Sequence, residues 1–296
     1  MSNAAPRFSS RFTFLISALG IAIGTGNIWR FPRIVATNGG ENGAGSFLVA
    51  WISFLFLWSI PLIIAEYVLG RQSRKGTVGA FAHFMGKPFA FLGGFVGFVS
   101  TAIAFYYSVV VGWNIYYFGS MTFNALPNTT ETSWEIWNNF QNGSFPIMFH
   151  AIAMSVGGFA IYKGVSSIEK VNRILIPILL AIVLLSVVRA LMLPGSMAGV
   201  SYLFTPDWAQ LKEPRIWLEA LTQNAWDTGA GWGLFLTYAI YIKKRYGIIK
   251  NAFTVAIGNN LVSLMAAVMI FSTVFSILGN EMGMAKSEIL DVMKSS

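Results

Sequence analysis

The sequence predicts an all-α integral membrane protein with two interrupted helices. Hydrophobic residues make up 55% of the 296 residues, charged residues only 11%, and the mean hydropathy is +0.61. That balance is typical of membrane proteins. A spanning helix needs about 20 apolar residues, and several runs approach or exceed that length. Polar, glycine-rich stretches break two further runs, which indicates helices that unwind within the membrane.

Seven candidate spans follow from the apolar runs. Five are uninterrupted and cover residues 47–69, 89–118, 147–162, 174–193 and 252–278. Two more, around residues 12–35 and 215–242, are apolar but broken. The start of the chain is polar and basic and has no A-x-A-like cleavage site, so we expect no cleavable signal peptide.

The placement of basic residues predicts the orientation. The formal charge is +8, and most of the 20 bases lie in alternate segments between spans. These bases are Arg7, Arg11, Arg71, Arg74, Lys75, Lys87, Lys163, Lys170, Arg173, Lys243, Lys244, Arg245 and Lys250. The segment 121–145 holds two glutamates and no base. By the positive-inside rule the N-terminus is cytoplasmic and 121–145 is external, in the plasma (inner) membrane. The charge therefore indicates topology, and we expect no nucleic-acid partner.

Enzyme chemistry finds little support in the sequence. The chain has no cysteine, which excludes disulfides and thiolate metal sites. Its two histidines, His83 and His150, lie far apart, and no paired-carboxylate or metal-ligand spacing occurs. We therefore expect a protein that is not an enzyme.

The first interruption is "GIAIGTGNIWRFPR", residues 20–33. Each glycine in a helix interior costs roughly 1 kcal/mol relative to alanine. Backbone groups freed in hydrocarbon cost several kcal/mol more unless protein or ligand satisfies them. Gly20, Gly24, Gly26 and Asn27 therefore predict an unwound segment that lines a cavity. Close helix packing is the alternative, because Gly20 and Gly24 form a G-x-x-x-G pair.

The second interruption is "QNAWDTGAGWG", residues 223–233. It places Gly229, Gly231 and Gly233 after Asn224 and Asp227 in an otherwise apolar run. Two broken helices in one chain indicate an inverted-repeat transporter with its binding site near the bilayer midplane.

Four motifs resemble the neurotransmitter:sodium symporter family, which includes bacterial amino-acid and animal monoamine transporters. They are "GIAIGTGNIWRFP", "NGGENGAGSF", "IPLIIAEYVLGR" and "FYYSVVVGW". The resemblance implies the inverted-repeat sodium-symporter fold, with discontinuous helices 1 and 6 and two five-helix repeats. It gives a single transmembrane domain over 1–296, with a first repeat at about 8–195 and a partial second repeat at about 213–279. The polar tail 280–296 resembles the start of an external loop.

The resemblance also assigns a substrate pocket. Its residues are Ala22, Thr25, Gly26, Ile103, Tyr107, Trp226, Gly229 and Trp232. Tyr107 would donate its hydroxyl to the substrate carboxylate, and Ile103 and the two tryptophans would line the side-chain pocket. Taken alone, a tyrosine in a membrane helix is equally consistent with packing or interfacial anchoring.

Co-transported sodium ions are implied at the same place. The resemblance assigns them to Gly20, Ile23, Ala22, Asn27, Asp227 and Asn259. The carbonyls of Gly20 and Ile23 would serve one ion; the Ala22 carbonyl and the side chains of Asn27 and Asn259 would serve the other. Without the resemblance, Asn259 could equally be a helix-to-helix hydrogen bond.

Asp227 departs from the family pattern, which has Ser or Thr at this position. An ionisable group within a span indicates function, although a helix cap is an alternative. Ser263 marks the expected chloride region, and the Asp227 carboxylate could supply the negative charge instead, so chloride dependence stays open. Arg30 resembles an external-gate arginine, with Gln223 beside it.

These features predict a sodium-coupled symporter of amino acids or related small amines. Because the second repeat is incomplete, we expect the chain alone to be unable to transport. A non-transporting membrane remnant or interaction subunit is the alternative. The expected partners are the small-molecule substrate and the lipid bilayer; the sequence leaves self-association and complementing helices open.

Overall fold

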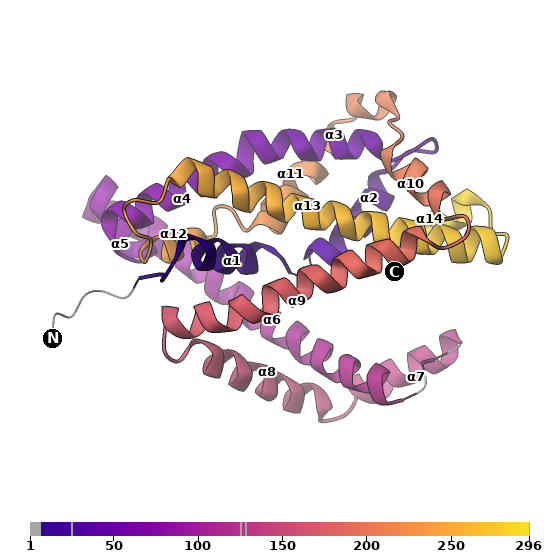
Figure 1. Cartoon of the computed structure of the whole chain (residues 1–296), viewed down its shortest axis with the longest axis horizontal. Coiled ribbons are helices and arrows are strands. Elements are labelled where there is room, and N and C mark those ends of the chain that lie inside the picture. The colour runs from indigo at the N-terminus through magenta and orange to yellow at the C-terminus, as the bar shows by residue number, and fades with distance from the viewer. Residues whose placement is uncertain (1–6, 25, 125, 128, 296) are drawn as a thin grey trace.

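A computed structural model describes residues 7–24, 26–124, 126–127 and 129–295, and in these residues every regular element is a helix (Figure 1). Four continuous helical segments are long and apolar enough to cross a membrane: Gly45–Ser73, Lys87–Phe123, Val165–Leu191 and Ile248–Glu281. The number rises to as many as six if each of two bent helix pairs is one span. The predicted all-α membrane fold is confirmed.

Both predicted interruptions are breaks between helices. The first separates α1 (Arg11–Ala22) from the π-helical η1 (Gly26–Arg30) and α2 (Phe31–Asn38), which run at 56° to α1. The second separates α11 (Pro214–Thr228) from α12 (Leu234–Ala239). The other bent pair, at 71°, joins α7 (Thr130–Gln141) to α8 (Phe145–Ile161).

The remaining helices fill the predicted spans and their connections. The span at Gly45–Ser73 consists of α3 (Gly45–Phe54), π-helical η2 (Leu55–Ser59) and α4 (Ile60–Ser73). The others are α5 (Thr77–Met85), η3 (Lys87–Phe89), α6 (Ala90–Phe123), α9 (Val165–Leu191), α10 (Ser196–Phe204), η4 (Trp208–Lys212), α13 (Ile248–Val274), η5 (Phe275–Glu281) and α14 (Lys286–Ser295).

The long helix α13 runs through the centre of the bundle. It contacts α1, α4, α9 and α10, and it also contacts η1 and α11 beside the two breaks. Figure 1 shows α5, α12 and the N-terminal segment at one end of the molecule and α10 and α14 at the other. α6 and α8 lie side by side. α13 therefore passes both breaks as it crosses from one end to the other.

Two apolar clusters fill the core, and a polar layer separates them. Along α13, Val255 and Ala256 belong to the first cluster, whereas Ala267 and Phe271 belong to the second. Between these positions α13 buries the polar side chains Asn259, Asn260 and Ser263. The first break divides the two clusters in the same way, with α1 on one side and α2 on the other. The polar groups therefore gather halfway along the bundle, where both breaks lie.

The C-terminal tail contains an amphipathic helix that the sequence analysis did not anticipate. In α14, Ile289, Leu290 and Met293 are buried, and the helix packs against α2 and η5. Arg33 of α2 also donates from Nε to the Lys294 carbonyl (3.2 Å). The expectation that residues 280–296 begin an external loop stays a prediction.

The contact between α4 and α12 depends on a glycine, and this is testable by thermal unfolding. A Cβ added to Gly70 would lie 2.0 Å from the Leu236 carbonyl oxygen, a backbone atom that cannot move alone. We expect Gly70→Ala to cost about 1–3 kcal/mol, as overpacking does, and to lower Tm by several degrees.

Gly119→Ala is the matched control, because nothing lies within 4 Å of the added methyl group. Gly119 lies in α6, four residues before the helix ends at Phe123, so the variant should leave Tm unchanged or raise it. Equal Tm values for the two variants would show that α4 and α12 are not packed as described.

Candidate functional site

Asn27 ties the first break to α13. The chain leaves the helix after Ala22, and Asn27 Oδ1 accepts a hydrogen bond from the Gly24 N–H at 2.7 Å. Asn27 Nδ2 donates to Asn259 Oδ1 (2.9 Å) and to Ser263 Oγ (2.8 Å). A side chain that is 1% exposed therefore both satisfies a freed backbone group and fixes the break against its neighbour.

Glycines make the second break. Gly229, Gly231 and Gly233 have φ angles of +63°, +92° and +75°, in the left-handed region. Glycine enters this region without the steric cost that a Cβ imposes. The three alternating glycines therefore let the chain end α11, cross the gap and begin α12 within five residues.

Glu66, for which the sequence predicts no role, satisfies the backbone of that break. Its Oε1 accepts from the Gly231 N–H at 2.6 Å and its Oε2 from the Leu236 N–H at 2.9 Å. The first N–H groups of a helix such as α12 have no partner within the helix. The available signal was a lone carboxylate in the apolar run of α4, because such groups in spans are usually functional.

A second buried network joins α11 to the π-helical turn η2. Asn224 Nδ2 donates to the Trp51 carbonyl at 2.6 Å, and Ser59 Oγ donates to Asn224 Oδ1 at 2.6 Å. Thr228 Oγ1 lies 3.1 Å from Ser59 Oγ and donates to it. In the sequence, Asn224 is only a flank of the second break. Its partners near η2 could not be predicted, because a π-helical turn has no clear sequence signal.

Asp227 lies at the centre of a chain of polar side chains. Gln223 Nε2 donates to its Oδ1 at 2.6 Å, and Ser263 Oγ donates to its Oδ2 at 3.2 Å. Arg30 donates to Gln223 Oε1, and its guanidinium lies 5.4 Å from the centre of the Trp226 ring. The alternative of Asp227 as a helix cap receives no support, because these partners are side chains and another carboxylate caps α12. The structure brings Arg30 and Gln223 together, and their gate role stays a prediction.

Three oxygen atoms converge between the breaks and α13. The side-chain oxygen of Asn259 lies 3.2 Å from the Ala22 carbonyl oxygen and 3.3 Å from the Asp227 carbonyl oxygen. Exchanging the amide oxygen and nitrogen of Asn259 would make both contacts hydrogen bonds, but it would set that nitrogen 2.9 Å from Asn27 Nδ2, donor against donor. Asn27 cannot turn in response without losing its bond from Gly24.

The oxygen orientation of Asn259 therefore agrees better with the bonds of Asn27. Oxygens this close repel each other unless a proton or a cation lies between them. Hard cations take main-chain and amide oxygens as ligands. In the described residues, no group of three or more His, Cys, Asp or Glu could hold a metal ion. The cluster of oxygens thus fits an alkali cation.

A pocket of about 290 Å³ opens beside these oxygens and draws its lining from α6 and from both breaks. The predicted residues that line it are Gly20, Ala22, Ile23, Gly26, Asn27, Ile103, Tyr107, Trp226, Asp227, Gly229 and Trp232. Arg30, Gln223, Asn259 and Ser263 are not among its lining residues, and Thr25 lies outside the described residues. The structure therefore gathers most of the predicted positions, and their binding roles stay predictions.

The walls of this pocket are aromatic. A Cβ on Gly24 would lie 2.9 Å from the Tyr107 hydroxyl oxygen, so this hydroxyl reaches the first break. Trp226 and Trp232 meet edge to face, with ring centres 5.6 Å apart. Ser100, which we did not predict, lines the pocket and donates to the Trp232 carbonyl. It lies seven residues before Tyr107, about two helical turns away on the same face of α6.

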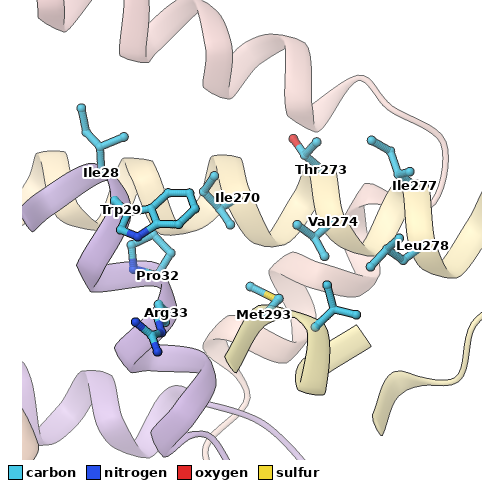
Figure 2. A pocket seen from close by; sticks show the side chains of 11 residues that line it. Ile28, Trp29, Pro32, Arg33, Ile270, Thr273, Val274, Ile277, Leu278 and Met293 are labelled. Carbon is cyan, nitrogen blue, oxygen red and sulfur yellow. The ribbon is translucent and has the colours of Figure 1, made fainter. Parts of the chain in front are cut away.

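A different hollow, of about 260 Å³, lies between α2, α13, η5 and α14 (Figure 2). Figure 2 shows Trp29 and Pro32 facing the side chains of Ile270 and Val274 across it. Its lining is apolar except for Arg33 and Thr273, and it contains no predicted site residue. This hollow therefore lacks the polar groups that a charged substrate requires.

The fold and the pocket define the class of the protein. It is a multi-pass membrane protein in which two discontinuous helices frame a polar pocket halfway along the bundle, and transporters are built in this way. The chain belongs to the sodium:neurotransmitter symporter family, whose model matches residues 5–146 and 144–296.

Named relatives agree with this assignment. The chain is 31% identical over 276 residues to an uncharacterized sodium-dependent transporter of Methanocaldococcus jannaschii, covering 90% of this chain and 55% of the relative. It is 31% identical over 284 residues to the uncharacterized sodium-dependent transporter YhdH of Bacillus subtilis. The match covers 93% of this chain and 61% of YhdH. The mouse sodium-dependent neutral amino acid transporter B(0)AT3 is 28% identical over 318 residues. The match covers 96% of this chain and 50% of B(0)AT3.

A solved structure agrees as well. MhsT in complex with L-phenylalanine superposes with a TM-score of 0.80 at 31% identity, covering 93% of this chain and 62% of MhsT. The chain thus spans between half and two thirds of the length of these relatives. The expectation that it is not an enzyme is confirmed, because the family and its relatives are transporters.

The role of Glu66 is testable by substitution. Glu66→Gln replaces one accepting oxygen with an NH₂ group that would face a backbone N–H of the second break. A buried donor without an acceptor costs about 1–3 kcal/mol, so we expect a clear fall in Tm.

Glu135→Gln on the exposed surface of α7 removes the same charge without burial and should leave Tm unchanged. A Glu66→Gln protein as stable as the wild type would show that the carboxylate does not hold the break.

Proposed function

We propose that this chain forms the sodium and substrate site of a symporter for amino acids or related small amines. The symporter would lie in the plasma (inner) membrane with its N-terminus cytoplasmic, as the basic segments predict. The observation that carries the proposal is the convergence of the Ala22, Asp227 and Asn259 oxygens beside a pocket that both breaks line. Relatives named as sodium-dependent transporters, one of them a neutral amino acid transporter, support it.

In this proposal the pocket binds the zwitterionic part of an amino acid between the breaks. The Tyr107 hydroxyl donates to the substrate carboxylate, and the first break at Gly24 and Gly26 lies within its reach. Ile103, Trp226 and Trp232 contact the substrate side chain. L-phenylalanine is the first ligand to test, because the similar protein MhsT is known in complex with it.

One proposed sodium ion binds the carbonyls of Ala22 and Asp227 and the side-chain oxygen of Asn259, which Asn27 orients by donating to it from Nδ2. All of these groups come from this chain. The other proposed ion has only the Gly20 and Ile23 carbonyls here, and a hard cation usually keeps more oxygen ligands than two. We therefore propose that the chain binds substrate with sodium but needs complementing helices, from a longer chain or a partner, for transport.

The Asp227 carboxylate also bears on chloride. It accepts a hydrogen bond from Ser263, the residue of the expected chloride region, and is 2% exposed. A fixed negative charge at this position would balance the proposed sodium ion without a bound anion. We propose that sodium-dependent binding does not require chloride.

Tyr107→Phe tests the substrate site. Removing one hydrogen bond to a charged group costs about 1.5–3 kcal/mol, so substrate affinity should fall roughly tenfold to a hundredfold. Equilibrium binding of labelled L-phenylalanine to the purified chain in NaCl measures it. Tyr106→Phe, on an adjacent side chain that is 59% exposed, should bind as the wild type does. Unchanged affinity in Tyr107→Phe would remove the hydroxyl from the site.

Asp227→Ser tests the chloride proposal. It restores the residue type usual in the family and removes the fixed charge. The wild type should bind equally well in sodium chloride and sodium gluconate, whereas the variant should bind roughly tenfold more weakly in gluconate. Asp291→Ser on the exposed face of α14 should show no anion dependence. Chloride dependence in the wild type would contradict the proposal.

Uptake into liposomes tests the need for complementing helices. The purified 296-residue chain, reconstituted with an inward sodium gradient, should bind L-phenylalanine yet accumulate none, because alternating access requires one repeat to move against the other. Gradient-driven accumulation would show that the chain transports unaided. Absence of both binding and accumulation would contradict the proposed site itself.

A further inference from the structure

A basic hollow of about 790 Å³ lies at the end of the bundle that carries the N-terminal segment. Residues from α4, the start of α13 and the connection before α13 line it. It is separate from the candidate transport pocket and shares no lining residue with it. No role in the proposed transport uses these residues.

The charged side chains that line the hollow are all cationic. Arg71, Lys244, Arg245 and Lys250 line it, and no carboxylate does. Among the described residues the one ion pair joins Lys294 and Asp291, in α14 at the other end of the bundle. The four cations therefore concentrate positive charge that no acidic side chain of the described chain neutralises.

The backbone that carries two of these cations is held in place. Arg71 donates from a guanidinium nitrogen to the Lys244 carbonyl at 3.4 Å and to the Tyr246 carbonyl at 3.1 Å. The Arg245 guanidinium lies 5.5 Å from the centre of the Tyr246 ring, which is itself buried. The side chains of Lys244, Arg245 and Lys250 are exposed and remain available to a ligand.

The other part of the hollow is apolar and belongs to membrane-spanning helices. Ile64 and Val68 of α4 face it from one side, and Ile249 and Phe253 of α13 from the other. Ile249 is 64% exposed and Phe253 is 37% exposed. An apolar wall directly beside a cationic rim, at the ends of two spans, matches a ligand with an anionic head and a hydrocarbon chain.

We propose that this hollow is a binding site for an anionic phospholipid. Its phosphate lies among Lys244, Arg245 and Lys250, and its acyl chain lies along the apolar wall of α4 and α13. Arg71 positions the connection before α13. A soluble phosphate would use the rim alone and leave the exposed Ile249 in water, so the wall favours the lipid.

Lipid titration of the purified full chain, followed by native mass spectrometry, tests the proposal. Phosphatidylglycerol should bind tightly and phosphatidylcholine weakly. The variant with Lys244→Gln, Arg245→Gln and Lys250→Gln should bind phosphatidylglycerol at least roughly tenfold more weakly, since each surface base contributes about a fivefold effect. The matched control changes Lys163, Lys170 and Arg173, in and beside α9, to glutamine. It loses the same charge and should retain wild-type affinity for phosphatidylglycerol.

Two further arms separate lipid from phosphate. Ile249→Ser should weaken phosphatidylglycerol binding severalfold, and millimolar inorganic phosphate should not displace the lipid. Displacement by phosphate together with an unchanged Ile249→Ser affinity would mean a phosphate site only and would overturn the proposal. Equal losses of phosphatidylglycerol affinity in the triple variant and its control would also overturn it. The effect would then come from the net charge of the protein and not from this hollow. If the triple variant does not fold, Lys244→Gln and Lys250→Gln are compared singly by the same criteria.

Discussion

The structure depends on the requirement that each backbone group freed by an interrupted helix must find a partner inside the protein. Water is absent from the hydrocarbon region, and an unpaired N–H or C=O there costs several kcal/mol. Buried polar side chains meet that requirement. Asn27 accepts from the first break, Glu66 from the second, and Asn224 donates to the Trp51 carbonyl beside a π-helical turn.

The same requirement explains why the polar residues form one layer. α13 passes both breaks, and it buries Asn259 and Ser263 at that level between two apolar clusters. Asn27, which accepts from the Gly24 N–H of the first break, presents its Nδ2 to Asn259 and Ser263 of α13. The Asn259 side-chain oxygen comes within 3.3 Å of the carbonyl oxygens of Ala22 and Asp227 in this way. The contacts that stabilise the breaks and the oxygens of the proposed cation site thus belong to one arrangement.

The sequence was sufficient to predict the class and the broken helices, and most of the positions predicted for binding line one pocket. Gly229, Gly231 and Gly233 in an apolar run are a local signal, and the structure places each at positive φ. The partners of the breaks were harder to predict, because they depend on which helices meet. Glu66 stood in a quoted motif without a role, and nothing near Ser59 in the sequence indicates that it bonds Asn224 on a distant helix.

The tail shows a second reason for missed structure. Residues 280–296 read as polar, yet Ile289, Leu290 and Met293 recur at helical spacing and are buried against α2 and η5. A three-residue stripe is too short to separate a packed helix from a loop by periodicity alone. The packing of α14 against α2 and η5, which the sequence does not display, decides that this segment is a helix.

Hydrogen exchange measured by mass spectrometry tests the central claim most directly. A ligand that binds only the folded arrangement stabilises it by RT ln(1 + [L]/Kd), so sodium should slow exchange in the peptides that contain both breaks. We expect protection of residues 20–28 and 224–236 in NaCl relative to KCl, and its loss in Asn259→Ala. Identical exchange in the two salts would contradict a sodium site shared by the two breaks.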